Sequence, residues 1–152
     1  MKNKVQPIDL IAPCGMNCRL CVSYQAGLYD INRQGYQKRY CPGCIPRGKH
    51  CTFMKKTCRV ITTGKARLCL ECASYPCRRL KDLDARYRKR YGMSMIDNLT
   101  TIKEKGILAL MKDEAIKWAC PSCGELMCCH THTCIHCESE KNIERHRTSN
   151  DD

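Results

Sequence analysis

Seven cysteines between residues 41 and 77 constrain this 152-residue chain more strongly than any other feature of its sequence. Two of the intervals are C-x2-C pairs, Cys41–Cys44 and Cys69–Cys72. This spacing lets one tight turn direct two thiolates at the same metal ion. The other members are Cys51, Cys58 and Cys77. The folded chain must therefore accommodate a dense group of thiols, either as disulfide bonds or as metal ligands.

Composition makes such cross-links necessary. The chain has 16 cysteines but only one Phe and one Trp, so large apolar side chains supply little core. Residues 1–13 are charged and interrupted by proline, unlike a secretory signal peptide, and no run of about 18 apolar residues could span a membrane. We therefore expect a cytoplasmic protein without a membrane partner. Because cytoplasmic thiols stay reduced, the C-x2-C pairs predict metal sites rather than disulfides.

The formal net charge of +12 is typical of proteins that bind nucleic acids, but cysteine ionisation weakens that argument. A zinc ion held by four thiolates has a net charge of about −2. Four such sites would contribute about −8, and +12 − 8 leaves about +4. Charge alone therefore does not separate a nucleic-acid partner from a protein partner.

The most specific metal motif lies near the C-terminus. The pairs Cys120–Cys123 and Cys134–Cys137 are separated by ten residues, which matches a short zinc ribbon of two knuckles joined by a hairpin. Four thiolates satisfy tetrahedral zinc and leave no open position. The intervening Cys128, Cys129, His130 and His132 leave two interpretations open. Either they are core or solvent-facing side chains, or one of them replaces a ribbon ligand or binds a second ion.

The central cysteines allow more than one arrangement of metal ligands. The simplest closed site combines Cys41 and Cys44 with Cys69 and Cys72. Cys51 and Cys58 are rival ligands, because a single sequence does not define which cysteines share an ion. His50 precedes Cys51 and is expected to be a solvated loop residue.

The first cysteine group has the spacing C-x3-C-x2-C and consists of Cys14, Cys18 and Cys21. Radical S-adenosylmethionine enzymes use this spacing to bind a [4Fe–4S] cluster, but they need a large α/β barrel, and this sequence lacks strand–helix alternation. A cluster with a fourth protein ligand such as Cys77 is the alternative to zinc, because four thiolates suit both. Sites made almost purely of cysteine favour structural centres over a catalytic metal.

The clearest predicted helix begins at Pro76, uses Ser74 as its N-cap and ends at Gly92. One face is apolar and the other is strongly basic. The apolar stripe consists of Cys77, Leu80, Leu83, Tyr87 and Tyr91. The basic face includes the candidate nucleic-acid contacts Arg78, Arg79, Arg88 and Arg90. The alternative is a solvated face that meets no partner.

The sequence predicts three further helices. Residues 18–29 place Leu20, Tyr24 and Leu28 four residues apart. Ser94 and Asp97 resemble a capping box for a helix that ends at Gly106. Its expected buried stripe is Ile96, Leu99 and Ile102. The last helix, roughly residues 107–118, is expected to bury Leu108, Met111, Ala115 and Trp118.

The N-terminal cysteines resemble those of a prokaryotic cysteine-rich family, domain of unknown function 3795. The resemblance rests on residues 12–21, Cys41–Cys44, Cys58–Arg59, and Cys69–Cys72 running into Tyr75–Cys77. It extends over roughly residues 12–110, and the C-terminal ribbon looks like an extension carried by some members. Such members look like zinc-binding proteins, but the family implies no activity.

These patterns predict a small, metal-dependent, mostly α fold with irregular cysteine-rich loops and a C-terminal zinc ribbon. Residues 1–118 would form a cysteine-rich domain with C-terminal helices, residues 119–138 a zinc-ribbon-like module, and residues 139–152 a polar tail. The expected function is a zinc-binding protein with several structural sites, acting as a non-enzymatic binding module. The alternative is an iron–sulfur redox protein with its cluster at the first cysteine group. A protein or nucleic-acid partner fits, and no small-molecule substrate is indicated.

The first testable expectation concerns metal removal. A structural zinc site contributes about 10–16 kcal/mol of apparent binding energy in small systems, which is comparable to a net domain stability of about 5–15 kcal/mol. We therefore expect a strong chelator, added under reducing conditions, to leave the chain largely unfolded. Far-ultraviolet circular dichroism during a thermal melt would check this. A chelated sample that kept its helical signal and melted cooperatively would contradict it.

Overall fold

The structure of the protein is a computed structural model that describes residues 6–47 and 58–140. Its α-helices are α1 (Val22–Leu28), α2 (Cys44–Arg47), α3 (Arg59–Thr62), α4 (Arg78–Tyr91), α5 (Met95–Lys105) and α6 (Ile107–Lys117). Its short 3-10 helices are η1 (Pro7–Leu10), η2 (Cys18–Leu20), η3 (Ile31–Gln34) and η4 (Cys69–Glu71). Residues 135–140 are also helical. Within the described residues there are isolated β-bridges but no strands, so the predicted mostly α, cysteine-rich fold is confirmed.

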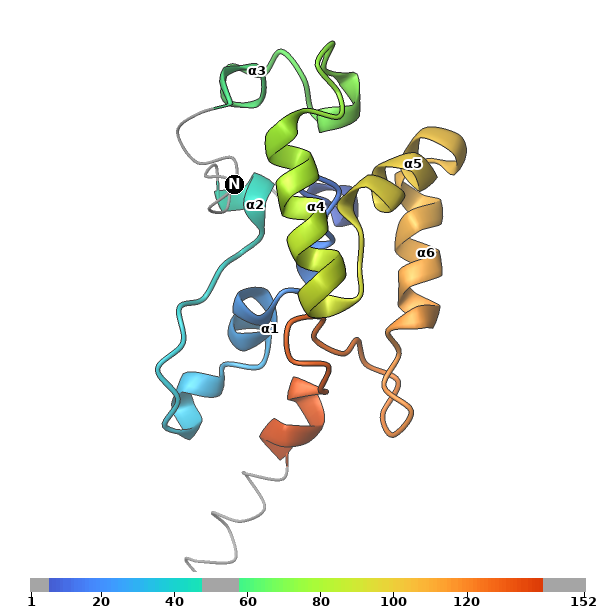
Figure 1. Ribbon diagram of the computed structural model, residues 1–152. Coiled ribbons are helices and arrows are strands. Elements are labelled where there is room, and N and C mark those ends of the chain that lie inside the picture. Colours follow the sequence, from blue (N-terminus) through green and yellow to red (C-terminus); the bar gives the residue numbers. More distant parts are fainter. Residues whose placement is uncertain (1–5, 48–57, 141–152) are drawn as a thin grey trace, which may run out of the picture.

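The three longest helices form one packed layer. α4 lies at the centre of Figure 1, α5 packs against it, and α6 packs against α5. The N-terminal loop and η2 lie behind α4, and the C-terminal cysteine segment lies below it in the same view. None of the described helices combines the length and the apolar character that crossing a bilayer requires.

Two of the predicted helix boundaries are confirmed and one is corrected. Ser94 caps α5, because its Oγ accepts a hydrogen bond of 3.0 Å from the Asp97 backbone N–H. α4 ends before Gly92, as predicted. Its first residue is Arg78 rather than Pro76, and Cys77 rather than Ser74 stands at the N-cap. Ser74 is exposed and makes no cap, because the chain is still in a turn there.

The buried faces of two helices differ from the prediction. α6 buries Leu110, Met111 and Glu114, while Leu108 is 69% exposed and Ala115 is also exposed. Hydrophobic periodicity predicted the wrong buried face for α6. The real buried face includes the carboxylate of Glu114, whose partner Asn17 is far away in the sequence.

The same kind of error affects the first predicted helix. Leu20 is fully buried, but Leu28 is 60% exposed. The chain forms two elements there, η2 and α1, and the break at Cys21 shifts the register between them. α1 consequently buries Gln25 and Ala26.

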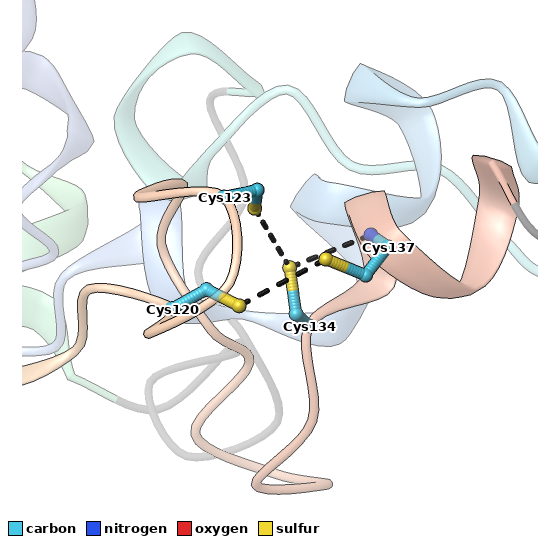
Figure 2. A group of neighbouring side chains, drawn as sticks. All are labelled: Cys120, Cys123, Cys134 and Cys137. Carbon is cyan, nitrogen blue, oxygen red and sulfur yellow. Dashed lines mark hydrogen bonds between the residues drawn. The ribbon is translucent and has the colours of Figure 1, made fainter.

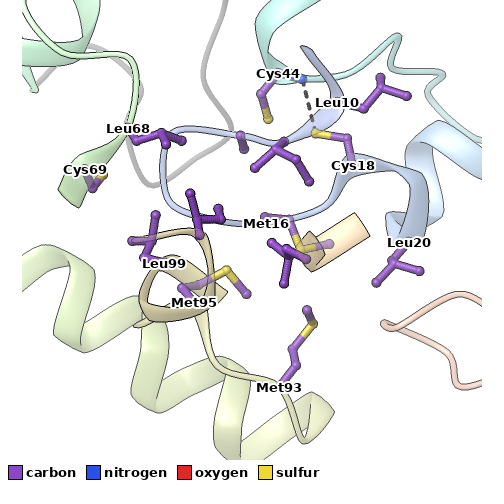
Figure 3. Close-up of a cluster of buried hydrophobic side chains, with 14 of the residues drawn as sticks. Leu10, Met16, Cys18, Leu20, Cys44, Leu68, Cys69, Met93, Met95 and Leu99 are labelled. Carbon is purple, nitrogen blue, oxygen red and sulfur yellow. Dashed lines mark hydrogen bonds between the residues drawn. The ribbon is translucent and has the colours of Figure 1, made fainter. Parts of the chain in front are cut away.

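The main core assembles around the loop between η1 and η2. Ile11, Leu20, Leu80, Met95 and Leu99 are fully buried in it. Figure 3 shows Met16 of this loop above Met95 and Leu99, while Cys18 points to Cys44 on the other side. Several buried members are cysteines or methionines, which fill irregular space where large aromatic residues are scarce. The loop that carries the first cysteine group is therefore part of the core and is not a surface loop.

A buried carboxylate connects α4 to α5. Asp84 accepts hydrogen bonds from the Ser94 hydroxyl (2.5 Å), the Ile96 backbone N–H (3.0 Å) and the Arg88 Nε (2.8 Å). Burial alone would raise the pKa of Asp84, but these donors outweigh it and lower the pKa below the ordinary aspartate value. The charge also lies at the N-terminus of α5, where the helix dipole favours an anion. Asp84 therefore fixes the angle between the two helices electrostatically.

We expect Asp84→Ala to lower the free energy of unfolding by about 3 kcal/mol, because it leaves buried donors without their charged acceptor. Urea denaturation of the metal-loaded protein at neutral pH would measure this. The matched control is Asp82→Ala, whose carboxylate is 68% exposed and only 4.0 Å from Arg78. That exposed pair should contribute less than about 1 kcal/mol. Equal effects of the two substitutions would contradict the role assigned to Asp84.

Candidate metal centre

Four thiols converge near the C-terminal end of the described chain. The sulfur atoms of Cys120, Cys123, Cys134 and Cys137 all lie within 4.8 Å of one another, and Figure 2 shows the four side chains pointing toward a common point. The Cys120 and Cys137 sulfurs are 3.9 Å apart, and those of Cys123 and Cys134 are 3.6 Å apart. Thiolates at about 2.3 Å from a tetrahedral zinc ion would be about 3.8 Å apart. The donor set and its geometry therefore fit a tetrahedral metal ion.

Two tight turns create this convergence. In the first, the Cys120 N–H donates to the Glu125 carbonyl (2.7 Å), and the Gly124 N–H donates back to the Cys120 carbonyl (2.8 Å). In the second, the Cys137 N–H donates to the Cys134 sulfur at 3.5 Å at the start of the last helical segment. The ladder between them is limited to the isolated bridges Ala119–Leu126 and Cys128–Thr133. The centre thus has two knuckles, but a full zinc-ribbon hairpin is not established.

The electrostatics of the four thiols favour a cation. Backbone N–H groups of Cys123 and Ser122 lower the pKa of Cys120 to about 6. Side-chain hydrogen bonds with Cys123 and Cys134 raise the pKa of Cys137 to about 12. One thiolate therefore forms readily, and its negative charge opposes ionisation of its neighbours. A divalent cation removes that opposition, so metal binding replaces the remaining protons.

The other cysteines and histidines of this segment do not belong to the four-cysteine group and make contacts elsewhere. Cys128 and Cys129 are completely buried, and burial raises the pKa of the Cys129 thiol. His130 accepts from the Val22 N–H at Nδ1 (3.3 Å) and contacts the Tyr87 hydroxyl at Nε2 (3.0 Å), so both of its ring nitrogens have partners. His132 is exposed and stacks near Trp118. Of the two interpretations offered by the sequence, Cys128 and Cys129 match the one in which they are core side chains.

The C-terminal segment is anchored on the N-terminal half of the chain. The Cys129 N–H donates to the Leu20 carbonyl (3.0 Å), and Gln25 Nε2 donates to the carbonyls of Leu126 and Met127 (3.2 Å each). A small apolar cluster of Ala26, Ile31, Cys128 and Ile135 closes the contact. No sequence pattern marked Gln25 as a structural residue, because two of its three acceptors lie about one hundred residues away.

In the structure, the cysteines of the first and central groups have neighbours other than those expected from their order in the sequence. Burial raises the pKa of the Cys69 thiol, and its neighbours Cys14, Cys58, Cys77 and Cys72 add to the effect electrostatically. Cys18 instead accepts a hydrogen bond from the Cys44 N–H. None of the fifteen described cysteines forms a disulfide bond. Cys51 and His50 lie outside the described residues.

The predicted ligand sets of the N-terminal half therefore stay predictions. In the described part of the chain, only the C-terminal group brings three or more potential ligand atoms within 4.8 Å of one another. Neither of the two predicted sets meets this criterion. These sets are Cys14, Cys18, Cys21 and Cys77, and Cys41, Cys44, Cys69 and Cys72. The structure places the pairs 41–44 and 69–72 beside different neighbours.

The basic face of α4 is only partly available to a partner. Arg78 and Arg79 are exposed, and the Arg78 side chain is 94% accessible. Arg88 forms ion pairs with both Asp84 (2.8 Å) and Asp97 (3.0 Å). Its first role is therefore to join α4 to α5, and it is a poorer candidate contact than its neighbours. Arg90 is exposed near the last turn of the helix.

Comparison with known protein families finds a match for the N-terminal half of the chain. Residues 10–82 match the family described as Protein of unknown function (DUF3795). This confirms the resemblance, which rests on nine of the ten cysteines from Cys14 to Cys77. The DUF3795 match ends within α4, so the four-cysteine centre at 120–137 lies outside it. No curated protein and no solved structure matches the chain.

The first knuckle of the four-cysteine centre depends on Gly124, which has a φ of +79°. A residue with a Cβ is strained there by about 1–2 kcal/mol. We expect Gly124→Ala to weaken zinc binding about 5- to 30-fold, because that strain opposes the metal-bound turn. Competition with a chromophoric chelator would measure the change. Gly124→Asn is the matched control, since asparagine tolerates this conformation, and equal losses for both variants would contradict the explanation.

Proposed function

We propose that this chain is a zinc-binding protein in which the thiolates of Cys120, Cys123, Cys134 and Cys137 hold one structural ion. The observation that supports the proposal is the spacing of the sulfurs, 3.6 and 3.9 Å, in a group of four thiols. A four-thiolate set saturates tetrahedral zinc and leaves no position for a substrate or a reactive water. The proposed role of the ion is therefore to stabilise the fold and not to catalyse a reaction.

A structural role fits the surroundings of the centre. The segment from Trp118 onward contains few large apolar residues, and the small cluster around Ile135 cannot by itself hold two turns and a short helix. A zinc ion would join the turn after α6 to the segment that packs on α1. It would thereby keep Leu126 and Met127 in place as acceptors for Gln25. Loss of the ion would loosen the contact between the two halves of the chain.

We further propose that the protein acts as a non-enzymatic interaction module. The support is the exposed basic start of α4, where Arg78 and Arg79 project from a helix that packs against α5. A fixed cationic face can meet the phosphates of a nucleic acid or an acidic surface of a protein. The nucleic-acid version is the easier one to test, because its affinity depends steeply on salt.

The zinc proposal predicts a specific change in metal content. Cys120→Ser/Cys134→Ser should contain one zinc ion per chain fewer than the wild type, because it removes one ligand from each knuckle. Elemental analysis of anaerobically purified protein, with an absorption spectrum, would measure this. Ser122→Ala is the matched control, since it alters the same knuckle without touching a thiol. Unchanged zinc content, or iron with a visible band lost in the double variant, would contradict the proposal.

The interaction proposal predicts salt-dependent RNA binding. Arg78→Glu/Arg79→Glu should weaken retention on immobilised single-stranded RNA and reduce the slope of log affinity against log salt by about 1–2. Lys103→Glu/Lys105→Glu on α5 is the matched control, because it reverses the same number of exposed charges elsewhere. Equal losses in both variants would indicate a non-specific charge effect. No retention of the wild type at low salt would exclude the nucleic-acid version.

A further inference from the structure

A second group of four thiols lines one cavity in the N-terminal half of the protein. The cavity has a volume of about 330 Å³ and lies between η2, the 41–44 turn and α4. Its lining includes Cys14 and the four thiols of two C-x2-C pairs, Cys18, Cys21, Cys41 and Cys44. We propose that these four cysteines bind a second tetrahedral, thiolate-preferring divalent ion of the zinc class. The pairing joins two C-x2-C turns that are twenty residues apart and is separate from the C-terminal centre.

A direct hydrogen bond holds the two turns together. The Cys44 backbone N–H donates to the Cys18 sulfur at 3.4 Å, and Figure 3 shows this contact at the edge of the core. The Cys41 N–H donates to the Ser23 carbonyl at 3.1 Å. The 41–44 turn is thus held by one hydrogen bond to the Cys18 sulfur and one to the main chain just after Cys21.

Each turn has the shape of a metal-binding knuckle. In the first pair the Cys21 N–H closes on the Cys18 carbonyl at 3.0 Å. In the second pair Gly43 has a φ of +108°, and a Cβ there would lie 2.9 Å from Leu10 Cδ2. Only glycine fits this position, because its backbone is left-handed and pressed against the core. The 41–44 turn is therefore pre-organised by packing.

The charges around the cavity suit an anionic four-thiolate centre. Such a centre with a divalent ion has a net charge of about −2. Arg47 Nη1 lies 4.0 Å from the Cys41 sulfur, and Arg86 and Arg90 also line the cavity. Burial of Cys18 (3% exposed) and Cys44 (8% exposed) makes this compensation stronger than it would be in bulk water.

The position of the remaining cysteines supports this pairing over the one favoured by sequence order. Cys58, Cys69, Cys72 and Cys77 line a different cavity, with Arg78 and Arg79 at its edge. Figure 3 shows Cys69 on the opposite side of the N-terminal loop from Cys18 and Cys44. The Cys44 N–H already contacts the Cys18 sulfur, and the proposed site requires the half-buried Cys21 and Cys41 to turn toward the same ion.

The decisive experiment is a comparison of metal content among variants of the full chain. Cys21→Ser and Cys41→Ser change the two half-buried ligands and leave the buried pair intact. We expect each to remove one zinc ion per chain, and the double variant to remove the same single ion. Cobalt substitution should show the matching loss of one thiolate-to-cobalt absorption band. Circular dichroism at 222 nm should stay near wild type for the single variants if α4–α6 remain folded.

Two further variants separate this site from its alternatives. Cys72→Ser should leave the ion at Cys21 and Cys41 bound, and Cys41→Ser should remove that ion whether or not Cys72 is also replaced. If Cys41→Ser and Cys72→Ser remove the same ion, Cys41 belongs with Cys69 and Cys72, and the proposal is wrong. Loss of iron and sulfide in Cys21→Ser would also overturn it in favour of a cluster. Cys120→Ser/Cys134→Ser removes a different ion, so failure here and failure of the C-terminal centre are distinguishable.

Discussion

The buried hydrogen bond between Asn17 and Glu114 fixes the loop on which the rest of the structure depends. Asn17 Nδ2 donates to Glu114 Oε2 at 2.9 Å, and both side chains are almost completely buried. Burial raises the pKa of Glu114, although the bond from Asn17 opposes that effect. A buried polar pair of this kind is costly if either partner is missing, so it selects one arrangement of the loop against α6. Asn98 adds a second tie by donating to the Gly15 carbonyl at 3.0 Å.

This loop distributes its cysteines to different sides of the core. The Cys69 N–H donates to the Pro13 carbonyl at 2.8 Å, which brings Cys14 toward the 58–77 group. A few residues later, Cys18 meets the turn at 41–44. Leu20 then accepts from Cys129, which connects the same loop to the C-terminal segment. One short stretch of main chain therefore contacts every described cysteine group.

Local signals in the sequence predicted several features correctly. The Ser94 cap, the ends of α4 and α5 and the four-cysteine group at 120–137 all follow from interactions within a few residues. The signals failed where a polar side chain is buried by a distant partner. Glu114 rotates the buried face of α6 away from Leu108, and Gln25 does the same for α1 and Leu28. Hydrophobic periodicity assumes that polar residues face water, and these two do not.

The sequence by itself determined that the chain is a mostly helical, cysteine-rich protein whose C-x2-C turns are suited to metal ions. That follows from spacing, because a tight turn needs only the residues between its two thiols. Only the tertiary structure decided which turns face each other. Cys44 meets Cys18 while Cys69 lies with Cys14, Cys58, Cys72 and Cys77, because buried hydrogen bonds and core packing around the 13–20 loop set those neighbours. Such long-range contacts leave no periodic trace in the sequence.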